Sequence, residues 1–94
     1  MKFRATIRYW RPDQASGLAV ADIPIEHISA LGGLKQQRVR GTINGAEYVS
    51  NVMPAGAGRL ALSVSKLMLR AGSVSVGDAA EFEIERLPAA TAPN

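Results

Sequence analysis

The sequence lacks cysteine and contains a single histidine, His27. Without cysteine the chain has no disulfides, thiolate metal sites or cysteine nucleophiles, and this composition suits a reducing compartment. One histidine without cysteine supplies too few ligands for a typical zinc site, and no motif suggests a serine–histidine–acid triad. We therefore expect no metal and no other cofactor, and we interpret His27 as a surface residue.

Long apolar runs are also missing. No run approaches the roughly 18 residues that a membrane span needs, and residues 1–11 alternate charged and apolar side chains instead of forming a signal-peptide core. These features predict a cytoplasmic location and no membrane partner. The 94 residues, 47% hydrophobic and 20% charged, fit one globular domain. The net charge of +3 permits contact with nucleic acid without indicating it.

Strand-like alternation is clearest over residues 3–11. Because side chains alternate between the two sides of a strand, this segment has one apolar and one basic face. The first face holds Phe3, Ala5, Ile7 and Tyr9, and the second holds Arg4, Thr6, Arg8 and Trp10. Shorter runs predict strands over residues 18–23, 38–43, 47–52, 59–62 and 79–87.

Turn and helix signals separate these strands. Asn44-Gly45 tolerates positive φ angles and predicts a two-residue hairpin. Pro24 can begin a helix of about two turns. Ser63 is a candidate N-cap for a second helix that ends before Gly72. The predicted apolar sides of the two helices are Ile25, Ile28 and Leu31 in the first, and Val64, Leu67, Met68 and Ala71 in the second.

A faint internal repeat relates residues 18–43 to residues 59–84, each reading strand, short helix, glycine and strand. In this alignment Ile23, Ile25 and Ile28 correspond to Leu62, Val64 and Leu67. Closing a duplicated unit into a barrel removes exposed sheet edges. We therefore predict a mainly β fold over residues 1–88: a closed, double-split, pseudo-symmetric β-barrel of six to seven strands with two capping helices. Residues 89–94 are predicted to form a flexible tail.

Four short segments of the chain together carry a family resemblance. They are Ile23-Pro24 before a helix, the run from Arg40 to Gly45, Met53-Pro54 followed by Gly56 and Gly58, and Gly72 followed by Val76-Gly77-Asp78. With these, residues 3–87 resemble the small bacterial domain of unknown function numbered nineteen-oh-five. The resemblance implies a split β-barrel, similar to the swapped-hairpin fold of transition-state regulators and antitoxins, and it implies no established activity. Those regulators bind DNA as dimers in which each subunit supplies one strand–helix–strand unit, whereas here both units would lie in one chain.

The glycine-rich segment 53–59 is the main candidate for a ligand site, read from the sequence as a loop. Glycines let a ligand approach the backbone, and Arg59 can pair with an anion. Lys66, on the second helix, would complete a small basic pocket, although solvated lysine is the commoner arrangement. The candidate ligand-binding residues are Met53, Pro54, Gly56, Gly58, Arg59 and Lys66. This predicts a non-catalytic binding or protein-interaction module for a small ligand or protein partner.

Nucleic-acid binding is the alternative function. Its candidate residues are Arg4, Arg8, Trp10, Arg38 and Arg40, which offer cations and an aromatic ring to phosphates and bases. Against this, Glu81, Glu83 and Glu85 lie on the outward face of the last strand. If the first and last strands pair, these glutamates neutralise arginines across the sheet. We expect this neutralisation.

Catalysis is the least supported class. An enzyme would have to use Asp78, Lys66 or Arg59 in an acid–base or anion-stabilising role. Asp78 follows Gly77 at the entry to the last strand. Aspartate in such a position commonly bonds nearby backbone N–H groups, so we interpret Asp78 as a turn residue.

Overall fold

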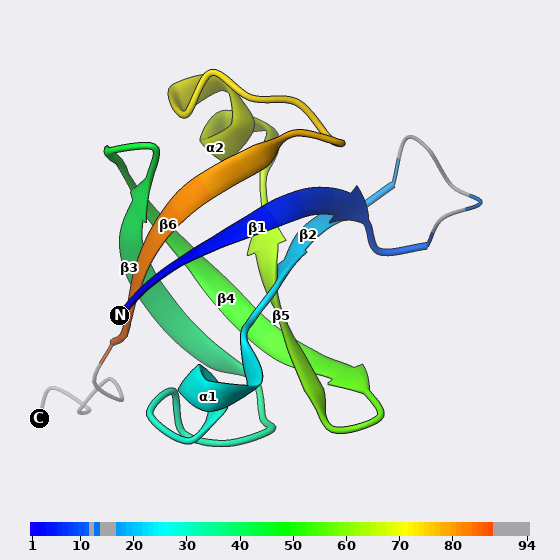
Figure 1. Cartoon of the computed structure of the whole chain (residues 1–94), viewed down its shortest axis with the longest axis vertical. Coiled ribbons are helices and arrows are strands. Elements are labelled where there is room, and N and C mark those ends of the chain that lie inside the picture. Colours follow the sequence, from blue (N-terminus) through cyan, green and yellow to red (C-terminus); the bar gives the residue numbers. More distant parts are fainter. Residues whose placement is uncertain (12, 14–16, 88–94) are drawn as a thin grey trace, which may run out of the picture.

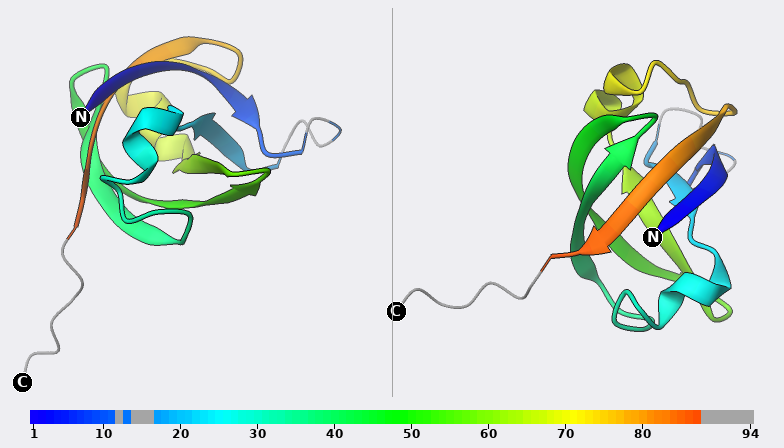
Figure 2. Two further views of the ribbon diagram at one scale, coloured as in Figure 1. Left: turned by 60° about the horizontal axis from the view of Figure 1, so that its bottom comes forward. Right: turned by 60° about the vertical axis from the view of Figure 1, so that its left-hand side comes forward.

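Six antiparallel strands close into a barrel with a short helix at each end, as predicted (Figures 1 and 2). The computed structural model describes residues 1–11, 13 and 17–87. The elements are β1 (Lys2–Tyr9), β2 (Ala19–Asp22), α1 (Ile25–Ile28), β3 (Gln37–Ile43), β4 (Ala46–Gly56), β5 (Arg59–Val64), α2 (Lys66–Ala71) and β6 (Ala79–Arg86). Around the barrel the strands follow the order β1-β2-β5-β4-β3-β6. The predicted tail lies outside the described residues.

Pairing between the first and last strands completes the barrel. Phe3 lies opposite Phe82, and Lys2 lies opposite Glu83. Met1 extends this pairing, because its amino group donates to the Ile84 carbonyl and its carbonyl accepts from the Ile84 N–H. The expected contact between the terminal strands is therefore confirmed.

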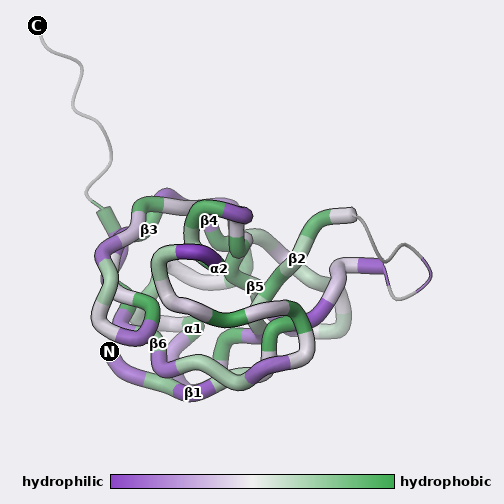
Figure 3. Tube along the Cα trace, turned by 90° about the horizontal axis from the view of Figure 1, so that it is seen from above, coloured by the Kyte–Doolittle hydropathy of each residue, from purple (hydrophilic) through white to green (hydrophobic). Residues whose placement is uncertain are grey.

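The core lies inside the barrel and follows the predicted alternation. In β6, Ala80, Phe82 and Ile84 are buried while the glutamates between them are exposed. Figure 3 shows the same alternation of hydropathy along the strands. Among the described residues no helix has the length and apolar character of a membrane span.

The turn between β3 and β4 is the predicted Asn44-Gly45 hairpin. The φ angles of Asn44 and Gly45 are 49° and 88°, the left-handed values that such a turn needs. The Asn44 side chain also joins three elements, because Nδ2 donates to the Gly72 carbonyl and Oδ1 accepts from the Glu81 N–H, each at 2.9 Å. The turn is thus anchored to both α2 and β6.

The segment expected to be a glycine-rich loop is instead most of a second hairpin. Strand β4 continues through Met53 and Pro54 to Gly56, and only Ala57 and Gly58 turn the chain. The pairing of β4 with β5 shifts register between Pro54 and Gly56. Beyond Val52, strand β4 pairs only with β5, so the backbone nitrogen of Pro54 can face the unpaired side of the strand without removing a ladder hydrogen bond.

The second helix begins two residues later than predicted. Ser65, not Ser63, is its N-cap, and the Ser65 hydroxyl accepts a hydrogen bond from the Met68 N–H at 3.1 Å. Ser63 and Val64 belong to β5. Met68 is buried as expected, but Leu67 is 74% exposed and Ala71 is exposed as well. Met68 is therefore the one helical residue of the predicted apolar side that faces the core.

The first helix is shorter than predicted and also faces differently. It comprises one turn, from Ile25 to Ile28, followed by turns to Leu31. Ile28 and Leu31 are buried as expected, whereas Ile25 is 74% exposed. A helix this short depends on its contacts with the barrel.

The strand register has an internal two-fold pattern. Adding 41 to the residue numbers of β2, α1 and β3 and 45 to those of β1 gives the second half of the chain. The pair Ile7–Ala21 then corresponds to the pair Val52–Leu62. Since β6 is the equivalent of β3, 41 is subtracted from its residue numbers, and the pair Phe3–Phe82 corresponds to Tyr48–Gly41.

The helix ends obey the same relation. The N–H of Gly33 donates to the carbonyl of Ile28, and the N–H of Val74 donates to that of Leu69. The correct offset between the helical units is therefore 41, not the 39 of the predicted repeat. The unequal offsets also show that the connection from β1 to β2 is four residues longer than that from β4 to β5.

Candidate functional site

The outer face of β1, β6 and β3 is covered by ion pairs. Arg4 lies 3.0 Å from Glu81, and Arg40 donates to Glu85. Lys2 and Glu83 approach to 3.9 Å. The expected neutralisation between arginines and the glutamates of the last strand is confirmed for Arg4 and Arg40.

Arg8 is also paired, but with a residue that was not predicted. Its Nε and Nη2 atoms each donate to a carboxylate oxygen of Asp22 at 2.9 Å. These hydrogen bonds to Arg8 lower the pKa of Asp22. Asp22 lies on β2, which pairs with β1, so its role depends on a strand contact that the local sequence pattern does not contain.

The remaining residues of the predicted nucleic-acid face are less constrained. Arg38 lies opposite Asn51 and has no ion pair among the described residues. Trp10, just after β1, is half-buried, and its backbone N–H donates to the Leu18 carbonyl. Three of the four arginines are therefore already compensated by carboxylates.

The structure separates the two cations of the predicted ligand pocket. Arg59 is the first residue of β5, and Lys66 follows the other end of that strand. A six-residue strand spans about 20 Å at roughly 3.3 Å per residue. Arg59 lies at the α1 end of the barrel, beside the tight turn that includes Gly58, whereas Lys66 lies at the α2 end (Figure 1). Arg59 and Lys66 consequently do not share a pocket.

Two residues considered for chemistry have structural contacts. Asp78 Oδ2 accepts a hydrogen bond from the Ser75 N–H at 2.9 Å, which confirms its turn role. His27 is half-buried, packs near Phe3 and lies 3.3 Å from the Lys2 carbonyl through Nε2. The interpretation of His27 as a simple surface residue was therefore incomplete, because the ring bridges α1 and β1.

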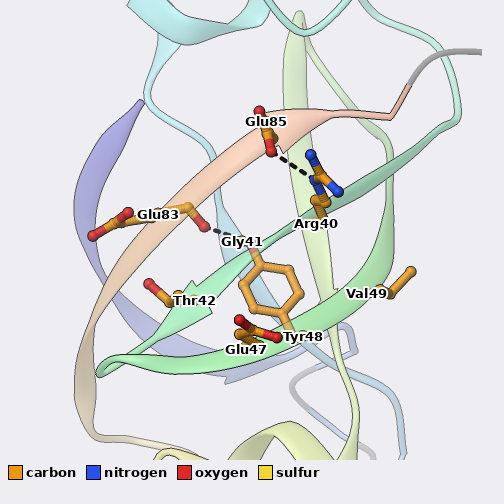
Figure 4. Close-up of a pocket in the computed structure, with 8 residues that line it drawn as sticks. All are labelled: Arg40, Gly41, Thr42, Glu47, Tyr48, Val49, Glu83 and Glu85. Atoms are coloured by element: carbon orange, nitrogen blue, oxygen red, sulfur yellow. Dashed lines mark hydrogen bonds and ion pairs between the residues drawn. The ribbon is translucent and has the colours of Figure 1, made fainter.

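One hollow, of about 630 Å³, lies on the outer face of β3 and β4 beside Gly41 (Figure 4). We call it the acidic hollow. A Cβ on Gly41 would lie 1.8 Å from the Glu83 carbonyl oxygen, so only glycine fits this crossing of β3 and β6. Tyr48 lies opposite Gly41, and its hydroxyl donates to that same carbonyl at 3.0 Å.

The polar groups of the acidic hollow are mostly engaged. Glu85 pairs with Arg40, and Glu83 approaches Lys2. Burial raises the pKa of Tyr48, so its hydroxyl stays protonated and keeps donating to the Glu83 carbonyl.

A second hollow, of about 430 Å³, lies between α2 and the place where β1 ends and β2 begins. We call it the α2 groove. Its walls are mainly apolar, and among them Leu18 is 44% exposed. The lining residues are Tyr9, Gly17, Leu18, Ala19, Val64, Ser65, Lys66, Leu69 and Val76. Its volume falls within the roughly 300–1,000 Å³ of small-molecule sites, which are mostly apolar with few polar groups.

Two polar side chains of the α2 groove have no partner in the described part of the chain. Lys66 makes no ion pair there, and the Tyr9 hydroxyl makes no hydrogen bond. The Ser65 hydroxyl, in contrast, is occupied as the helix cap. The groove thus offers a cation and a hydroxyl beside apolar walls.

Of the predicted ligand residues, only Lys66 lines the α2 groove; Met53, Pro54, Gly56, Gly58 and Arg59 do not. The groove depends on the pairing of Ala19 with Val64, which brings the start of β2 to the end of β5. The internal repeat could have pointed to the groove, because with the correct offset of 41 its lining residue Leu18 is equivalent to Arg59 of the predicted site. The predicted site and the groove are therefore equivalent positions at opposite ends of the barrel.

The architecture defines a small closed β-barrel domain with two short capping helices. Residues 3–84 match the family model of DUF1905, a domain of unknown function. The chain belongs to this family. The resemblance derived from the sequence is confirmed. No curated protein matches the chain.

Proposed function

We propose that this chain is a non-catalytic binding module and that the α2 groove is its ligand site. The observation that carries the proposal is an apolar groove of about 430 Å³ that retains two unpartnered polar side chains. In the acidic hollow, by contrast, Arg40 pairs with Glu85, and the Tyr48 hydroxyl donates to the Glu83 carbonyl. A ligand entering the groove would displace water from apolar surface and have polar groups to orient it.

A neutral apolar probe tests the proposal. Titration of the chain with 4-phenylbutanamide, followed by amide chemical shifts, should move signals of residues such as Ala19, Val64 and Leu69 together. Leu18→Ser should weaken binding about fivefold, because burying a leucine-sized surface contributes roughly 1.5–3 kcal/mol and Leu18 is only partly exposed.

Leu67→Ser is the matched control. Leu67 is 74% exposed on α2 and lies outside the groove, so its replacement should leave the affinity unchanged. Probe binding elsewhere on the barrel, or equal weakening by both serine variants, would contradict the proposed site.

We further infer that the two halves of the barrel arose by duplication of one strand–strand–helix–strand unit, giving a double-split barrel. Support comes from the strand register and the helix-end hydrogen bonds, which repeat from one half to the other. The lack of cysteine supports a reducing compartment such as the bacterial cytoplasm, which cell fractionation would test.

A further inference from the structure

We infer that the α2 groove selects small organic anions, with an apolar body against the groove walls and a carboxylate at Lys66. This inference rests on the proposed function and adds the chemical class of the ligand. Among the described residues that line the groove, Lys66 alone is charged. The groove therefore has a positive charge at its polar edge and apolar side chains along the rest.

The position of Lys66 supports a role outside folding. It is the first residue of α2, and the first turn of this helix contains no acidic residue. A cation at a helix N-terminus is disfavoured by the helix dipole. Lys66 also makes no ion pair within the described residues. The charge of Lys66 therefore adds no ion pair to those that stabilise the described part of the barrel.

The charges around the groove favour the same ligand. The four ion pairs of the described residues involve Glu81, Glu83, Glu85 and Asp22, and none of these lines the groove. In the part of the lining that the structure describes, no carboxylate competes with a bound anion for Lys66. Tyr9 also lines the groove, and its hydroxyl, which has no partner among the described residues, is free to hydrogen-bond a ligand there.

Paired probes of the same shape test the charge selection. In the whole chain we expect 4-phenylbutanoate to bind about fivefold more tightly than 4-phenylbutanamide, since a partly exposed ion pair contributes about 1 kcal/mol. The amine 4-phenylbutylamine should bind more weakly than the amide. Raising the salt concentration should reduce the preference for the acid by screening the charge.

Lys66→Gln should bring the affinities of acid and amide together without lowering the thermal stability. Arg70→Gln is the matched control: it removes a cation from the same helix outside the groove and should keep the fivefold preference. Equal binding of acid and amide by the unmodified chain would overturn the anion selection and leave the binding module intact. Groove signals that shift with protein concentration alone would show a second copy of the chain there and would also overturn it.

Failure of the proposed function has a different signature. In that case the neutral amide would also leave the groove signals unmoved, and the acid would bind, if at all, at another cationic surface. Persistence of the acid preference in Lys66→Gln would place the anion elsewhere and contradict the inference.

Discussion

Two equivalent cross-strand pairs are filled in different ways. In the first, Phe3 stacks on Phe82 with ring centroids 5.1 Å apart. In the second, Tyr48 faces Gly41, and its hydroxyl reaches the Glu83 carbonyl. One register thus accepts two aromatic rings at one position and a ring with a glycine at the other. The difference shows that the pairing pattern of the barrel is kept while its packing is not.

The two ends of the barrel differ in a related way. At the α2 end Leu18, Lys66 and Val76 line an apolar groove. Their equivalents at the α1 end are Arg59, Ile25 and Lys35, which line neither of the two hollows described above. The connection from β1 to β2 is also the longer one. The two ends therefore share one pattern of strand pairing and differ in the side chains that surround it.

The largest effect is expected at Gly41. Gly41→Ala would place a methyl group against the Glu83 carbonyl, where the nearest distance is 1.8 Å, and should destabilise the chain by about 3 kcal/mol. Gly45→Ala should cost about 1 kcal/mol, because it has open space and only its positive φ is unfavourable. Urea unfolding of both variants measures the difference, and equal losses would show that the close crossing is not decisive.

Asn44→Ala should destabilise the chain by about 2 kcal/mol, because it removes two side-chain hydrogen bonds of about 1 kcal/mol each. The equivalent position in the other half is Glu85, an exposed strand residue paired with Arg40, so no second anchor of this kind exists at that position. Asn44→Asp is the control, since it keeps the acceptor for the Glu81 N–H and should lose less. Hydrogen exchange at the Glu81 N–H, which donates to Asn44 Oδ1, would locate the effect, and unchanged exchange there would contradict it.

Tyr48→Phe should cost about 1 kcal/mol, because it removes the hydrogen bond to the Glu83 carbonyl while keeping the ring. The variant makes the second aromatic position chemically like Phe3. A chain as stable as the original would show that the ring alone, without its hydroxyl, closes the barrel beside Gly41. Thermal unfolding is the appropriate measurement.

The smallest effect is expected at Asp22. Its pKa is lowered by Arg8 in the folded chain, so the pair stabilises the fold above about pH 3.9, the ordinary aspartate value, and this contribution is lost as the pH falls through the folded pKa. Asp22→Asn should therefore lower the free energy of unfolding by about 0.5–1 kcal/mol near neutral pH and by less in acid. The equivalents of Arg8 and Asp22 are Met53 and Ser63, so the second half has no such pair. A loss independent of pH would contradict this assignment.

Local patterns predicted the barrel well because its strands alternate cleanly and its Asn44-Gly45 turn has a strong local signal. They failed where the outcome depends on long-range register. Pro54 and Gly56 suggested a loop, yet the pairing of β4 with β5 extends through both residues. The α2 groove was missed because Leu18 and Lys66 become neighbours only through the pairing of β2 with β5.

The hydrogen bonds between Met1 and Ile84 place the start of the chain against its last strand. A short linker from Leu87 to Met1 would therefore let the polypeptide be opened elsewhere, at an exposed turn such as Asn44-Gly45. Opening it there would reverse the order in which the two halves are synthesised while leaving every strand neighbour in place. We therefore expect the strand pairing of the barrel not to depend on which half comes first in the chain.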